Sequence, residues 1–81
     1  MLTQGGFLEA VRRLLQTDER WRDTCHAERG PRKEVRLKWT AKGLPGLYEL
    51  HNALRKLAAH HGWLVDTSAE DYTELRPGYE F

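Results

Sequence analysis

Residues 45–62 read PGLYELHNALRKLAAHHG, and this stretch decides the predicted fold. Its apolar residues and one histidine recur at spacings of three and four, which places them on one face of a helix: Leu47, Leu50, Leu54, Leu57, Ala58 and His61. Pro45 suits the first turn, where its missing N–H has no helical partner, and Gly62 suits a left-handed cap. A helix with one wide apolar stripe must pack on another surface, so we expect a sheet built from the flanking segments.

Three strand-like segments flank this helix. Residues 34–40, EVRLKWT, alternate between polar and apolar side chains as a half-buried strand does. Residues 63–68, WLVDTS, and 72–76, YTELR, predict two further strands, joined by a turn into an antiparallel hairpin. The range 34–76 is therefore predicted to be a βαββ unit, and we expect its last strand at an edge of the sheet.

The range 1–30 is predicted to be helical. Its first amphipathic stripe consists of Phe7, Leu8, Val11, Leu14 and Leu15. Gly5 and Gly6 argue for a helix start near Phe7, with Thr3 as the cap of an earlier start. Trp21 and Cys25 lie four residues apart, which extends the helical pattern until Gly30 and Pro31 end it.

The predicted fold class is therefore α+β: an N-terminal helix followed by a βαββ unit, with one small sheet and the helices packed on one of its faces. The 81 residues are expected to form a single domain that closes with a short tail at 77–81.

Composition limits the class of protein. With 40% hydrophobic residues and abundant charge the chain is typical of a globular protein, and no apolar run is long enough to span a membrane. The first residues lack the layout of a signal peptide. The single cysteine, Cys25, excludes an internal disulfide framework. We therefore expect a cytoplasmic location and no membrane partner.

Charge is distributed unevenly along the chain. Residues 29–42 hold six basic residues and one acid, whereas residues 63–81 hold five acids and one base. In one interpretation the two segments neutralise each other across neighbouring strands. In the other they form a bipolar surface that steers a partner.

The sequence offers no catalytic or metal-binding pattern. Cys25 and His26 could join His60 and His61 at a zinc ion by residue type, but adjacent residues on a helix point about 100° apart. Cys25 lacks a nucleophile motif, and the glycines match no phosphate loop. We therefore expect no enzyme activity, no metal and no cofactor.

The remaining hypothesis is a protein-interaction module: a small adaptor, an inhibitor, or a subunit that binds a protein partner or a second copy of itself. An exposed edge strand can pair with another chain, and acids on it favour a basic partner. The residues expected to contact the partner are Glu70, Asp71, Tyr72, Glu74 and Trp21. If the acidic hairpin makes no contact, the first helix around Arg12, Arg13 and Trp21 is the next candidate.

The alternative function is nucleic-acid binding through the basic segment. Its side chains could follow a phosphate backbone: Arg29, Arg32, Lys33, Arg36, Lys38 and Lys42. Trp39 is expected to point into the core, which leaves no obvious aromatic ring for base stacking.

Overall fold

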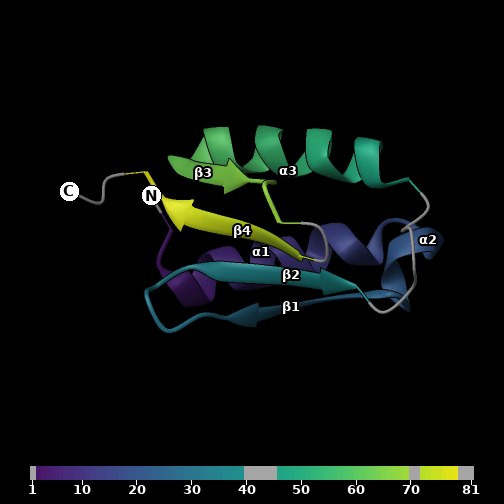
Figure 1. The fold of residues 1–81 in the computed structure, drawn as a ribbon, viewed down its shortest axis with the longest axis horizontal. Coiled ribbons are helices and arrows are strands. Elements are labelled where there is room, and N and C mark those ends of the chain that lie inside the picture. Colours follow the sequence, from purple (N-terminus) through teal and green to yellow (C-terminus); the bar gives the residue numbers. More distant parts are fainter. Residues whose placement is uncertain (1, 40–45, 70–71, 79–81) are drawn as a thin grey trace.

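A computed structural model describes residues 2–39, 46–69 and 72–78, and Figure 1 shows the arrangement of its elements. In chain order these are α1 (Gln4–Gln16), α2 (Glu19–Arg22), β1 (Cys25–Arg29), β2 (Val35–Trp39), α3 (Leu47–His61), β3 (Trp63–Asp66) and β4 (Tyr72–Pro77). The α+β class, the N-terminal helix and the βαββ unit are confirmed.

The four strands form one antiparallel sheet in the order β1-β2-β4-β3. β4 therefore lies between β2 and β3, and these two strands run in the same direction on either side of it. The prediction that the last strand lies at an edge is wrong, because β4 is paired along both sides. The edge strands of the described sheet are β1 and β3.

The N-terminal segment takes the earlier of its two predicted helix starts, with Thr3 as the cap, and departs from the predicted helix at β1. α1 begins at Gln4, where the Thr3 hydroxyl accepts a hydrogen bond from the Gly6 N–H at 3.1 Å, so the cap outweighs the cost of the two glycines. The predicted helix over 1–30 is wrong for Cys25–Arg29, which form β1. Cys25 and Ala27 are buried there while His26 is exposed, and pairing with β2 stabilises this alternation.

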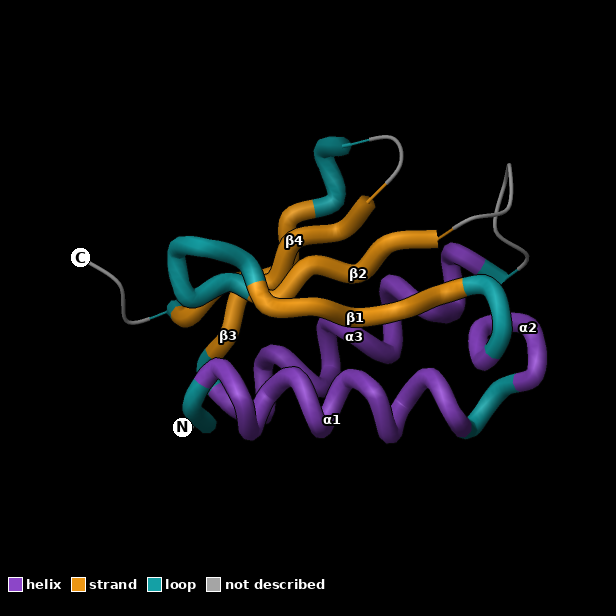
Figure 2. Tube along the Cα trace, turned by 90° about the horizontal axis from the view of Figure 1, so that it is seen from below, coloured by secondary structure: helices purple, strands orange, loops and turns teal. Residues whose placement is uncertain are grey.

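Both long helices cover the same face of the sheet, as Figure 2 shows from the side, and the opposite face carries no described helix. The core lies between the two layers. From α1 it takes Phe7, Leu8, Val11 and Leu15, and from α3 it takes Leu50, Leu54 and Ala58. The sheet contributes Val35, Leu37, Trp63 and Leu75.

The helix predicted from residues 45–62 is confirmed as α3. Leu50, Leu54 and Ala58 are buried, and His61 is half-buried with its ring edge-on to Phe7. Gly62 ends the helix in the left-handed conformation at a φ of 72°. Pro45 lies outside the described residues. Within the described ranges no helix is long and apolar enough to cross a membrane.

Candidate functional site

In the described sheet β1 has no neighbouring strand along its outer edge. The Gly30 N–H donates to the Glu34 carbonyl at 2.8 Å, which makes this the hydrogen-bonded pair that closes the β1–β2 ladder. Antiparallel ladders alternate, so His26 and Glu28 direct their peptide groups at β2. Cys25, Ala27 and Arg29 therefore direct their peptide groups away from the sheet, at the open edge.

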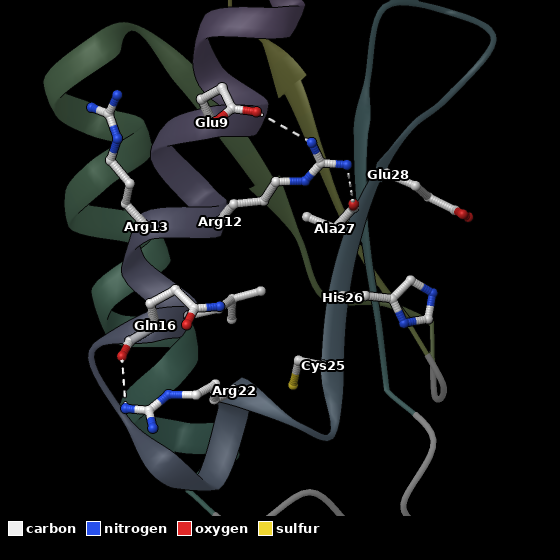
Figure 3. A pocket seen from close by; sticks show the side chains of 10 residues that line it. Glu9, Arg12, Arg13, Gln16, Arg22, Cys25, His26, Ala27 and Glu28 are labelled. Atoms are coloured by element: carbon white, nitrogen blue, oxygen red, sulfur yellow. Dashed lines mark hydrogen bonds and ion pairs between the residues drawn. The ribbon is translucent and has the colours of Figure 1, made fainter.

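A groove of about 690 Å³ lies between α1 and this edge, and Figure 3 shows it from close by. Its charged lining comes from three elements: Glu9, Arg12 and Arg13 on α1, Arg22 at the end of α2, and Glu28 on β1. Leu15, Cys25 and Ala27 form its apolar part. The groove therefore lies directly beside the outer edge of β1, and its lining is partly apolar and partly charged.

Arg12 lies across the middle of the groove. Its Nη2 donates to the Ala27 carbonyl oxygen at 3.4 Å, and its Nη1 pairs with Glu9 Oε1 at 3.2 Å (Figure 3). The Ala27 carbonyl is the central acceptor of the open edge. A charged side chain over an edge strand discourages indiscriminate pairing, so Arg12 protects β1 in the free protein.

Arg22 lies at the end of the groove that is nearest to Cys25. Its Nη2 donates to the Gln16 carbonyl oxygen at 3.1 Å, which caps the C-terminal end of α1 where positive charge is favourable. Among the described residues no ion pair holds Arg22 or Arg13.

Cys25 contributes a thiol to the groove and not a reactive thiolate. Its side chain is buried, and desolvation raises the pKa of the thiol although the Thr24 hydroxyl acts in the opposite direction. In the described ranges no group of three or more His, Cys, Asp or Glu residues could hold a metal ion.

The predicted partner-contacting residues are not brought together as one surface. Glu70 and Asp71 lie outside the described residues. Trp21, which we expect from the sequence to contact a partner, is 5% exposed and packs in the core. Little of its ring therefore lies on the surface of the free chain. Glu74 and Tyr72 lie on β4 inside the sheet, where Arg36 sits 5.7 Å from the Tyr72 ring centre and 3.9 Å from a Glu74 oxygen.

The basic segment is largely neutralised where it crosses the sheet. Lys38 pairs with Glu28 at 2.7 Å, and Arg36 pairs with Glu34 at 3.3 Å. Neither pair reaches the acidic segment 63–81; among the described residues Arg36 does so through Glu74 at 3.9 Å, the kind of contact that the neutralisation interpretation predicts. All three pairs leave less positive charge for a phosphate backbone. Arg29, Arg32 and Lys33 are exposed at the end of β1 and in the following turn, and Lys42 lies outside the described residues.

Glu34 is the one buried carboxylate in this network, at 2% exposure. Desolvation raises the pKa of Glu34, but the Arg32 N–H, which donates to Oε1 at 2.6 Å, lowers it more strongly together with the other hydrogen bonds and the Arg36 charge, so the net pKa is lowered. Glu34 therefore fixes the β1–β2 turn as a charged group.

Sequence reasoning missed Ala27 and Arg22, and it named Cys25 and Arg29 only for their side chains and not for their backbone groups on β1. Cys25, Ala27 and Arg29 carry the candidate site through their backbone, which leaves no side-chain signature. The sequence predicts Arg12 and Arg13 only as the second choice of contact surface, after the acidic hairpin. No family model, no curated protein and no solved structure matches the chain.

Proposed function

We propose that this chain is a non-enzymatic protein-interaction module that binds an extended segment of a partner protein as an additional strand on β1. One observation carries the proposal: the outward peptide groups of Cys25, Ala27 and Arg29 lie beside the groove of about 690 Å³ between α1 and β1. Such an edge is where a sheet accepts a strand from another chain.

The energetics favour this mode of binding. Each of the three outward residues offers one N–H and one C=O, and a hydrogen bond contributes roughly 0.5–1.5 kcal/mol after exchange with water. Alternate side chains of the added strand would enter the groove, which Leu15 and Cys25 line together with charged side chains. The backbone supplies affinity, and the groove supplies selectivity.

β1 is a better candidate than the opposite edge. β3 has four residues, whereas β1 has five. The cavity lies against β1 and is lined by α1 and α2, so an added strand contacts side chains from three elements.

The test begins with linear peptides displayed on phage and selected on the full chain. A selected peptide is synthesised, and amide hydrogen exchange is measured with and without it. Strand addition should protect the amides of Cys25, Ala27 and Arg29.

A matched pair of variants sharpens the result. Arg29→Pro removes one outward N–H and leaves the β1–β2 ladder intact, so affinity should fall by about tenfold or more. Arg29→Ala keeps that N–H and should have a much smaller effect. A peptide that binds both variants equally, or that leaves the edge amides unprotected, would contradict the proposal.

A further inference from the structure

The groove beside β1 carries arginines at two levels along the strand. Arg12 is bonded to the Ala27 carbonyl, and Arg22 lies near Gln16 at the Cys25 end (Figure 3). Cys25 and Ala27 are two positions apart, which corresponds to about 6.5–7 Å along a strand. The Arg12 side chain reaches β1, whereas that of Arg22 points toward Gln16 in the free chain and lines the groove at the level of Cys25.

The carboxylates near the groove do not balance these arginines. Glu28 is occupied by Lys38 at 2.7 Å, and Glu9 pairs with Arg12 alone. Arg22 is held by a backbone carbonyl and by no ion pair among the described residues. The groove thus keeps an excess of positive charge that complements an acidic ligand.

We propose that the partner segment is acidic and carries two carboxylates separated by one residue. This inference rests on the proposed strand addition to β1. Residues directly opposite each other in a sheet direct their side chains to the same face. Guest residues opposite Cys25 and Ala27 would therefore both face the groove, one beside Arg22 and the other beside Arg12, and the residue between them would face away.

Arg12 changes its partner in this arrangement. A backbone N–H of the guest takes its place on the Ala27 carbonyl, and the released guanidinium binds the guest carboxylate. A hydrogen bond between two charged groups is stronger than one to a neutral carbonyl, so the exchange favours the acidic guest. Glu9 stays in place, because a guanidinium has five N–H donors and can serve two carboxylates.

The experiment compares short synthetic peptides on the full chain by calorimetry and amide exchange. The first holds two glutamates separated by a valine within a valine- and threonine-rich segment. The second replaces both glutamates by glutamine. The third keeps the sequence of the first but carries a methyl group on the backbone nitrogen of each glutamate, which removes the N–H groups that would pair with Cys25 and Ala27 at unchanged charge.

We expect the glutamate peptide to protect the amides of Cys25, Ala27 and Arg29 and to bind about tenfold or more tightly than the other two. Its advantage over the glutamine peptide should shrink at high salt. Arg12→Gln and Arg22→Gln together should abolish that advantage, whereas the matched control Arg55→Gln, on an exposed site of α3, should preserve it. Circular dichroism of each variant checks that the fold is retained.

The outcomes separate the two proposals. Equal binding of the glutamate and glutamine peptides with protected edge amides overturns the acidic preference and leaves strand addition standing. Equal binding of the glutamate peptide and its N-methylated form indicates attraction to any polyanion and overturns the inference. Binding that leaves the edge amides unprotected overturns both proposals, and so does the absence of binding by any peptide, selected or synthetic.

Discussion

The ring of Phe7 on α1 stacks on the ring of Trp63 at the start of β3, with centroids 4.2 Å apart and planes 5° apart. This contact joins the first helix to the hairpin at the far end of the chain. Phe7 is fully buried, and Trp63 is almost so. The two rings therefore tie the first turns of α1 to β3, while the rest of the helix lies beside β1 at the opposite edge of the sheet.

Phe7→Ala should lower the free energy of unfolding by about 3–5 kcal/mol, because the lost ring leaves a cavity beneath Trp63. Denaturant unfolding followed by circular dichroism gives the value. Lys56→Ala, at an exposed site of α3, should change it by less than about 0.5 kcal/mol. Equal, small losses in both variants would show that the Phe7 contact contributes little.

Gly30→Ala should destabilise the chain by about 1–3 kcal/mol. A Cβ at this position would overlap the buried carboxyl group of Glu34, which would have to leave the Arg32 N–H and Arg36. Gly6→Ala, in the first turn of α1, is the control, because its Cβ would meet only Leu2 and Thr3, at ordinary contact distances of 3.4 Å or more. Replacing a helical glycine by alanine there should stabilise the chain by about 0.5–1 kcal/mol. Thermal melts of both variants should therefore shift in opposite directions.

His51 should make stability depend on pH below neutrality. Its Nε2 lies 2.8 Å from the hydroxyl of the fully buried Thr73. Desolvation lowers the pKa of His51, and the nearby Arg55 charge lowers it further. The unfolded chain binds the proton more readily than the folded chain. The contribution of neutral His51 to the free energy of unfolding is therefore present above a pH of about 6.5 and is lost as pH falls through the folded-state pKa.

His51→Gln removes this titration while keeping a side chain that can bond Thr73. Its free energy of unfolding, measured by denaturant titration between neutral and mildly acidic pH, should fall less steeply than that of the unchanged protein. Identical pH profiles would show that His51 is equally basic in the folded and unfolded chains.

Amide exchange along β1 in the free protein should alternate. The amides of His26, Glu28 and Gly30 face β2 and should exchange slowly, whereas those of Cys25, Ala27 and Arg29 face the open edge and should exchange quickly. Residue-resolved NMR exchange gives the pattern without any partner. Uniform protection along β1 would indicate that its outer edge is already covered.

By itself the sequence determined α3, the first amphipathic stripe and the three strands that follow Gly30. Each has a period that a short window reveals, as in Leu50, Leu54 and Ala58 on α3 or Val35 and Leu37 on β2. Such a stripe must be buried whichever element packs on it. The period therefore identifies the segment as a helix or a strand before its partner is known. For the same reason the placement of both helices on one face of the sheet could be predicted.

The tertiary structure alone decided β1, the strand order and hence the candidate site. Cys25–Arg29 reads CHAER, in which small or weakly apolar residues give little alternation and the spacing from Trp21 suits a helix. Only the ladder with β2 makes this segment a strand. The position of β4 between β2 and β3 likewise depends on pairing between residues far apart in the chain, such as Leu37 with Thr73. Which backbone groups remain unpaired is a property of the completed sheet, so the groove with Arg12 and Arg22 appears only once the strands are assembled.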